Sequence, residues 1–373
     1  MLNVDNTAKY LLERGLVTTE AILFDDLCVT TATRRNPNII VTHAGAAPSL
    51  LIKQVDAAVK GADLSLGIEG AFYRFAEASG QADLIAAMTR VIALDEQNRR
   101  LLIAFLPGAL TLWNYIRRFT PPDVPLLVFS RLGSILASLH AMRSDSSELQ
   151  VFKGHLRSET PWALRAHRPT PDLVATLSRA NFEILRIVQS QPELVCRLDS
   201  LTDLWRPTGL IHGDIKADNI LVVPKPDGSG AAEVKLVDWE LVQIGDPAWD
   251  LAGVLQDLVL FWINTMSPAE SVDAMVTSAI WPWPAVQPAF GAMAQGYATL
   301  SRIDAAAFNA LCLKAVRFCG ARLIQTAFEM AQMSDSIPTA SALLLQLSGN
   351  LLADPYLAQV QLFRLMSRVE WAA

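Results

Sequence analysis

One amide and two acidic residues stand at a spacing that suits phosphoryl transfer. In residues 209–221 an apolar run leads to a tight loop that carries Asp214, and Asn219 follows five positions later. Asp238 comes where the next strand should end. Transfer from a nucleoside triphosphate needs a carboxylate that orients a hydroxyl group, together with oxygen ligands for Mg²⁺. The segment therefore predicts a kinase of hydroxyl groups.

Each residue of this constellation has a predicted role. Asp214 can accept the proton of the attacking hydroxyl, and Asn219 and Asp238 can bind Mg²⁺, a hard cation that prefers oxygen ligands. Lys216 lies on the same loop and can reach the γ-phosphate, while His212 ties the loop to its surroundings. An Asp and an Asn at this spacing are usually part of a surface loop. The flanking apolar strands and the second Asp argue against that alternative.

Three segments resemble a known family in content, order and spacing. They are His212–Asn219, Val237–Glu240 and Gly245–Ala252. They resemble the aminoglycoside phosphotransferase and choline kinase family, which shares the protein-kinase-like fold. The resemblance implies an ATP-dependent enzyme in which Asp214 is the catalytic base and Mg²⁺ is bound by the Asn and the second Asp named above.

The resemblance also implies a role for Asp250. In the family an acid at this position is buried and braces the catalytic loop through hydrogen bonds. A second interpretation is a carboxylate near a helix N-terminus, which the helix dipole stabilises. Both interpretations can hold at once.

A kinase fold also needs a cation for the α- and β-phosphates, held by an acid from a helix. The strand Ser49–Gln54 carries Lys53 near its end, and Glu69 follows 16 residues later on the next helix. We expect these two residues to pair. Glu77 lies on the same helix and is the alternative partner, but the spacing favours Glu69.

The segment that would cover the phosphates lacks the glycine pattern of protein kinases. Thr33–Asn38 stands there instead, and Arg34 or Arg35 can contact phosphate, although an arginine pair in a turn is more often solvated. We expect adenine to lie under the segment that links the lobes. The backbone groups of Ala104 and Phe105 can bind the purine edge there.

The patterns of apolar residues divide the chain at Pro107-Gly108. Before this break the predicted elements are a helix in residues 1–20, a helix around Phe72, and strands over Ala21–Val29, Ile39–Thr42, Ser49–Gln54, Thr89–Leu94 and Arg100–Phe105. After it we expect helices over Leu126–Met142, Leu173–Val188, Ala305–Met333 and Ala340–Val369, strands at 209–223 and 233–238, and a rigid loop at 267–288. This predicts an α+β, protein-kinase-like bilobal fold. Its small nucleotide-binding N-lobe covers 1–106 and its mostly helical C-lobe covers 107–373.

Composition narrows the class of protein and its partners. Of 373 residues, 51% are hydrophobic and 18% are charged, which suits a large core. The hydrophobic share is high enough that a second copy or a partner protein could cover some apolar surface. The net charge of −6 argues against nucleic acid and is compatible with a cationic substrate. No signal peptide or membrane span is evident, so we expect a cytoplasmic protein. The four cysteines have no CxxC spacing, which argues against a zinc site.

The sequence leaves open which class of molecule accepts the phosphate. A small molecule such as an amino sugar, an antibiotic or another metabolite is the leading hypothesis. Acidic and aromatic residues that suit an ammonium group occur in the last third of the chain, but they are scattered. The alternatives are a kinase of Ser or Thr in a peptide and a nucleotide-binding scaffold without turnover. The intact Asp214, Asn219 and Asp238 argue against the scaffold.

Overall fold

The computed structural model of the chain describes residues 1–33, 37–45, 49–55, 62–152, 154, 156–224 and 232–365. These residues form two compact units, which we describe separately. Unit 1 comprises Met1–Leu110, Val151–Leu156 and Leu221–Val242, and unit 2 comprises Thr111–Gln150, Arg157–Ile220 and Gln243–Ala373. The first segment of unit 1 ends close to the expected lobe boundary at 106. Its two later segments were not anticipated from the sequence.

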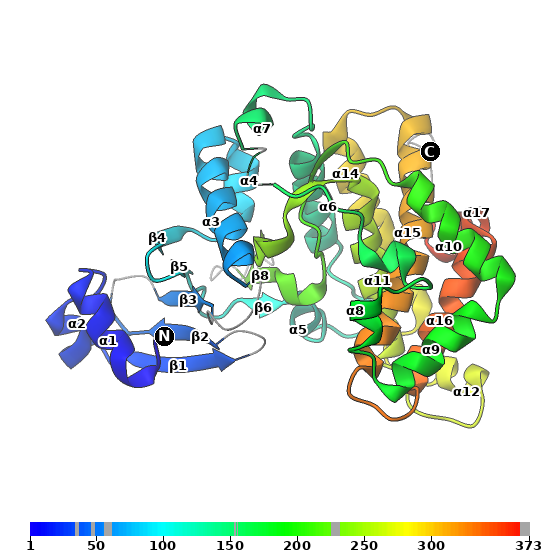
Figure 1. Ribbon diagram of the computed structural model, residues 1–373, viewed down its shortest axis with the longest axis horizontal. Helices are drawn as coiled ribbons and strands as arrows, with labels where there is room; N and C mark the ends of the chain where they lie inside the picture. The colour runs from blue at the N-terminus through cyan, green and yellow to red at the C-terminus, as the bar shows by residue number, and fades with distance from the viewer. Residues whose placement is uncertain are drawn as a thin grey trace. The chain divides into compact units, whose positions relative to one another are not determined.

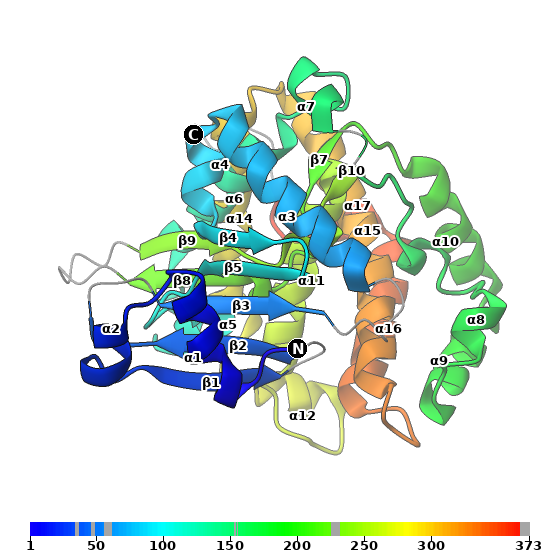
Figure 2. The same ribbon diagram turned by 60° about the vertical axis from the view of Figure 1, so that its left-hand side comes forward.

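Unit 1 is built on a five-stranded antiparallel sheet in the order β1-β2-β3-β5-β4 (Figure 2). The strands are β1 (Cys28–Thr33), β2 (Pro37–Thr42), β3 (Leu50–Gln54), β4 (Val91–Asp95) and β5 (Arg100–Ala104). The pairing of β3 with β5 sets Lys53 opposite Leu101. A register shift between Val91 and Ala93 interrupts the pairing of β4 with β5.

Helices cover this sheet because its apolar face must be buried. Leu2 and Leu11, from α1 (Val4–Glu13) and the residues before it, are buried in one cluster with Val41 and Ile52 of the sheet. Figure 2 shows α1 in front of β1 and β2. The remaining helices are α2 (Thr19–Phe24), α3 (Ala62–Ser79) and α4 (Ala82–Ala87). Strand β9 (Ala232–Leu236) and the short helix η4 (Trp239–Leu241) also belong to this unit.

Unit 2 consists mainly of helices (Figure 1). They are α5 (Leu112–Ile116), α6 (Leu126–His140), η2 (Trp162–Arg165), α8 (Pro171–Val174), α9 (Arg179–Gln189), α10 (Pro192–Leu204), η3 (Ala217–Asn219), α11 (Pro247–Ile263), α12 (Val272–Thr277), α13 (Trp283–Val286), α14 (Pro288–Ser301), α15 (Ala305–Ala331), α16 (Thr339–Ala353), α17 (Pro355–Leu357) and η5 (Ala358–Leu362). Strands β7 (Gly209–Ile211) and β10 (Gln243–Gly245) form a two-stranded antiparallel sheet. Strands β6 (Leu110–Thr111) and β8 (Ile220–Pro224) and helix α7 (Ser147–Phe152) run across the unit boundaries along the chain.

Helix α11 lies in the core of unit 2, and 15 of its 17 residues are buried. It packs against α15, which in turn packs against α16 (Figure 1). A helix that is apolar on all sides is typical of such a buried position. The acidic residues of α11 are therefore enclosed by protein and need partners for their polar atoms.

Several expected elements differ from the structure. The expected strand Ala21–Val29 is replaced by helix α2 and a strand that begins only at Cys28. Thr18 caps this helix by accepting a hydrogen bond from the Ala21 N–H, and such a cap outweighs the strand propensity of the apolar residues that follow.

Three further differences concern unit 2. The expected helix Leu173–Val188 is divided into α8 and α9, because Ser178 starts a new helix as its N-cap. The expected loop at 267–288 contains α12 and α13. The last expected helix ends at Ala353, where Pro355 prevents it from continuing. Among the described residues, no helix is both long and apolar enough to span a membrane.

Candidate active site

The loop after β7 holds Asp214 in a fixed arrangement. Lys216 Nζ lies 2.6 Å from Asp214 Oδ2, and Asn219 Nδ2 donates to the same oxygen at 3.0 Å. Asn219 Nδ2 also donates to the backbone carbonyl of Asp214 at 2.9 Å. Gly213 has a φ of 83°, in the left-handed region that glycine adopts without strain. The structure thus brings together the predicted base, Lys216 and the predicted amide ligand.

Asp250 and His212 support this loop from inside unit 2. Asp250 is fully buried and accepts hydrogen bonds from His212 N–H at 2.7 Å and Gly213 N–H at 3.0 Å. Burial opposes its ionisation, but contacts with His140 and His212 outweigh burial and keep the pKa of Asp250 below its ordinary value. His212 is also buried, and its Nδ1 accepts from Asp214 N–H at 3.3 Å. His212 therefore shapes the loop from within the protein.

In unit 1, Lys53 forms an ion pair with two acids. Its Nζ lies 2.8 Å from both carboxylate oxygens of Glu69 and 2.6 Å from Asp238 Oδ1. Burial alone would lower the pKa of Lys53, but the charges of these two carboxylates outweigh it and raise the pKa. Lys53 is consequently a cation at neutral pH. The expected partner on α3 is Glu69, as the spacing indicated.

Asp238 occupies an unusual backbone conformation. Its φ of 69° and ψ of 59° lie in the left-handed region, which costs a non-glycine residue free energy. Trp239 follows it and donates its backbone N–H to Glu69 Oε1 at 3.3 Å. Its ring packs against that of Phe72, tilted by 38° with 4.6 Å between ring centroids. These contacts hold the turn, so that the carboxylate of Asp238 is presented at the end of β9.

The predicted magnesium ligands fit the cation chemically. Asn219 and Asp238 offer an amide oxygen and a carboxylate oxygen, the groups that Mg²⁺ prefers. The amide nitrogen of Asn219 donates to Asp214, so Oδ1 of Asn219 is the atom that would bind the cation. Within the described residues no three His, Cys, Asp or Glu side chains gather as a metal-binding group. The magnesium role of the two residues stays a prediction.

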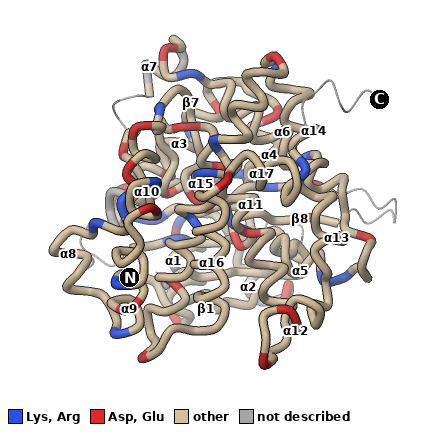
Figure 3. Tube along the Cα trace, turned by 90° about the vertical axis from the view of Figure 1, so that its right-hand side faces the viewer, with Lys and Arg blue, Asp and Glu red and all other residues tan. Residues whose placement is uncertain are grey.

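A polar hollow of about 170 Å³ lies beside Asp214 in unit 2. Its wall comes from separate segments of the chain: α5, the catalytic loop, α11 and α15. The charged and aromatic residues in the wall are Trp113, Asp214, Lys216, Asp218, Asp257, Arg322 and Glu329. Four carboxylates thus meet two cations in this wall. Along the trace in Figure 3 acidic and basic positions are interspersed.

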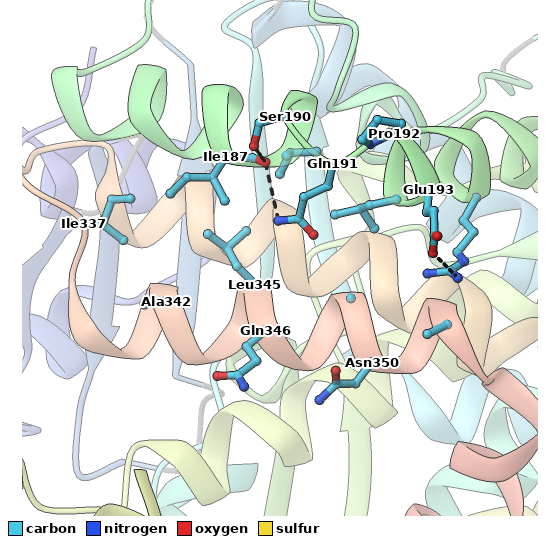
Figure 4. A pocket seen from close by; sticks show the side chains of 15 residues that line it. Ile187, Ser190, Gln191, Pro192, Glu193, Ile337, Ala342, Leu345, Gln346 and Asn350 are labelled. Carbon is cyan, nitrogen blue, oxygen red and sulfur yellow. Dashed lines mark hydrogen bonds and ion pairs between the residues drawn. The ribbon is translucent and has the colours of Figure 1, made fainter. Parts of the chain in front are cut away.

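A larger hollow of about 760 Å³ lies elsewhere in unit 2. Figure 4 shows it between α16 and the segment from α9 to α10. Its wall consists mainly of aliphatic and amide side chains, such as Leu345 and Gln346, and its ion pair joins Glu193 to Arg197. This wall offers no arrangement for phosphoryl transfer, so the hollow beside Asp214 is the candidate site.

Two of the expected nucleotide contacts need comment. The N–H of Ala104 donates to Arg90 O and that of Phe105 to Ser49 O, both at 2.8 Å. Both N–H groups thus have acceptors within unit 1. A purine would therefore have to bind the carbonyl oxygens of Ala104 and Phe105. The predicted phosphate contact of Arg35, like its alternative Arg34, falls outside the described residues.

Comparison with known families agrees with this geometry. Residues 32–288, more than half of the chain, match the phosphotransferase enzyme family. The chain belongs to this family. The resemblance drawn from the three sequence segments is therefore confirmed.

Individual relatives of this phosphotransferase are distant. A 4-hydroxytryptamine kinase of Psilocybe cyanescens is 24% identical over 214 residues, which are 53% of this chain and 56% of the relative. The chain thus matches little more than half of the length of that curated relative.

Solved structures extend the likeness over most of the chain. The Plasmodium vivax ethanolamine kinase has a TM-score of 0.53 and 13% identity, with coverage of 92% of this chain and 87% of its own. The microcompartment-associated aminopropanol kinase has a TM-score of 0.50 and 14% identity, with coverage of 91% and 94%. At these identities the likeness concerns the fold, and it confirms the predicted α+β, kinase-like class.

Three residues contact the catalytic loop in ways that the sequence did not predict. Trp249 Nε1 donates to Gly213 O at 3.0 Å, Arg322 Nη2 donates to Ile215 O at 2.9 Å, and Asp257 accepts from the N–H of Ala217. The sequence held one signal for Asp257, since it interrupts an otherwise apolar helix. Nothing in the spacing indicated that Arg322, more than 100 positions later, returns to this loop.

Proposed function

We propose that this phosphotransferase moves the γ-phosphate of ATP to a hydroxyl group of a small molecule that also carries an amine. The observation that carries the proposal is the hollow beside Asp214, in which four carboxyl groups meet two cations. Burial raises the pKa of one of them, Asp257, to about 7, and the other three carboxylates still outnumber the cations. An ammonium group on the acceptor would compensate this excess of negative charge. A hollow of about 170 Å³ suits a molecule smaller than a peptide or a multi-ring antibiotic.

The relatives support the same class of acceptor. Their names describe kinases of 4-hydroxytryptamine, ethanolamine and aminopropanol, each of which has a hydroxyl group and an amine. The match to the first covers only part of its length, and the other two resemble this chain in fold. They therefore favour the class of acceptor without identifying the molecule.

The residues divide the chemistry among themselves. Asp214 would orient the acceptor hydroxyl and accept its proton as the phosphate is transferred. Lys216, 2.6 Å from that carboxylate, holds it in place and carries positive charge toward the phosphate. Lys53 would bind the α- and β-phosphates. Asn219 and Asp238 would hold Mg²⁺, which when bound supplies charge neutralisation at the phosphates.

A transfer assay with mass spectrometry tests the proposal. The panel contains amino alcohols, hydroxylated arylalkylamines, aminoglycosides and Ser/Thr peptides, each offered with Mg-ATP, and for every amine the matching alcohol without nitrogen. We expect a gain of one phosphate on amine-bearing small molecules, with kcat/KM at least tenfold above that of the amine-free match. Asp214→Asn serves as the inactive control. Phosphate only on peptides, or equal use of both members of each pair, would contradict the proposal.

A further inference from the structure

One face of α11 follows the catalytic loop along its length. Asp250 accepts hydrogen bonds from two backbone amides, those of His212 and Gly213, at the start of this loop (residues 212–219). Three residues later, the backbone at Gly253 lies so close that a Cβ there would come within 2.6 Å of Ile215 O. Four residues further, Asp257 Oδ2 accepts the Ala217 N–H at 2.6 Å. Positions i, i+3 and i+7 share one helix face, so a single rigid element contacts both ends of the loop.

Asp257 accepts a hydrogen bond from a backbone N–H that has no acceptor within its own helix. Ala217 is the first residue of the short helix η3, and the first N–H groups of a helix have no intrahelical acceptor. Both residues are buried, with 6% of Asp257 and 3% of Ala217 exposed. A buried N–H without an acceptor is costly, which favours an alternative loop conformation whenever this carboxylate is removed.

Arg322 gives the buried carboxylate a charge partner. Its guanidinium lies 4.7 Å from the centre of the Trp249 ring, and its Nη2 donates to Ile215 O. Burial opposes the ionised form of Asp257 most strongly. The Ala217 N–H and the charge of Arg322 favour that form, and the neighbouring Asp218 opposes it. Ile215 and Ala217 are thus held by two side chains that also line the hollow beside Asp214.

We propose that Asp257 is a positioning residue for phosphoryl transfer: by fixing Ala217 it fixes η3, and thereby holds the amide of Asn219 against Asp214. The inference rests on the proposed function and adds to it a residue outside the sequence motifs. Asp250 holds the start of the loop and Asp257 holds its end, and the two are separated by two turns of one helix, about 10 Å. The spacing between the base and the amide ligand is therefore set by α11.

The expected effect of losing this contact is on the rate of the chemical step. Reacting groups that are misplaced by about 1 Å can cost on the order of 100-fold in rate. Asp257→Leu has a similar size but offers no acceptor for the Ala217 N–H. Asp257→Asn keeps an oxygen that can accept this bond.

The experiment compares these two variants in full-length protein with the acceptor found in the panel assay. We expect Asp257→Leu to lower kcat about 100-fold with the KM for ATP within threefold of the original, and Asp257→Asn to restore kcat to within tenfold. Hydrogen exchange of the peptide around Ala217 gives a readout without catalysis. Exchange of the Ala217 amide should speed up at least tenfold in Asp257→Leu and stay slow in Asp257→Asn.

Asp95→Leu is the matched control, because Asp95 is a buried, hydrogen-bonded carboxylate in unit 1. It should lower the melting temperature without changing kcat of the folded protein. A kcat of Asp257→Leu within threefold of the original, or unchanged Ala217 exchange, would overturn the positioning role while the proposed function stands. If the original chain transfers no phosphate to any acceptor, the proposed function fails. Faster exchange of the Ala217 amide in Asp257→Leu would in that case still show that Asp257 holds the loop.

Discussion

Asp214 has the most direct role in the proposed transfer chemistry. Asp214→Asn keeps the size of the side chain and removes the oxygen charge that Lys216 and Asn219 now contact. We expect kcat to fall by 100-fold to 10,000-fold, the range for a general base, with the Kd for Mg-ATP changed less than threefold. Calorimetric titration measures the Kd for Mg-ATP, and the transfer assay measures kcat. Asp145→Asn, at an exposed ion pair, is the control, and a mutant with full turnover would exclude Asp214 as the base.

Lys53 has an observed structural role in its ion pairs and a proposed role in binding phosphate, and a double variant separates the two. Lys53→Met leaves Glu69, which is 1% exposed, without its cation, and breaking a buried pair in this way costs about 3–5 kcal/mol. Lys53→Met with Glu69→Gln removes the cation and the buried acid, and the remaining charge is that of Asp238, whose side chain is 36% exposed. We therefore expect most of the unfolding free energy to return. The KM for ATP should stay at least tenfold raised in the double variant. Urea denaturation and steady-state kinetics measure the two, and a normal KM for ATP would argue against the phosphate role.

At the scale of elements, the approach of α11 to the catalytic loop depends on a glycine. Gly253→Ala places a Cβ 2.6 Å from Ile215 O and 3.3 Å from the guanidinium carbon of Arg322. The loop must shift, so we expect kcat to fall at least tenfold although residue 253 does not line the hollow. Gly291→Ala in α14 is the matched control, since its Cβ meets nothing within 4 Å, and it should raise the unfolding free energy by about 0.5–1 kcal/mol. Equal kinetics of the two variants would show that the loop tolerates the displacement.

Elements with strong local signals were predictable from the sequence, and those set by distant contacts were not. Strands β2, β3 and β5, helices α6 and α15, and the positions of Asp214 and Asn219 agree with the pattern of apolar and polar residues. Helix α2 was missed because a capping Thr outweighed strand propensity. The pairing of Lys53 with Glu69 followed from spacing. The role of Arg322 did not, because it arises from the packing of α15 against α11.

Over the whole molecule, the candidate acceptor site extends beyond the part that identifies the family. The family match ends at residue 288, but Arg322 and Glu329 of α15 line the hollow beside Asp214. The predicted catalytic residues therefore lie in the matched region, while part of the wall that would select the acceptor lies outside it. This separation explains why the motifs predicted a kinase of hydroxyl groups and left its acceptor open.

The stability of the whole molecule should depend on pH through Asp257. Burial raises the pKa of this carboxyl from 3.8 to about 7, so between these values the folded chain holds a proton that the unfolded chain has lost. The contribution of Asp257 to the unfolding free energy is therefore full below pH 4 and declines as the pH rises to 7. Asp257→Asn cannot titrate and should escape this loss. We expect its unfolding free energy, relative to the original, to be higher at pH 8 than at pH 4 by up to about 4 kcal/mol.

Urea denaturation of both proteins at pH 4 and pH 8 measures this difference, and groups common to both proteins cancel in it. A difference that does not change with pH would mean that Asp257 is ionised in the folded protein throughout. Arg322 and the Ala217 N–H would then outweigh burial, and the ionised Asp257 would hold the end of the catalytic loop as a permanent anion beside Arg322. A difference that grows with pH means instead that the loop is held by a carboxyl group whose ionisation is costly. Such a group is retained at a cost in stability, which is expected of a residue that positions a catalytic loop.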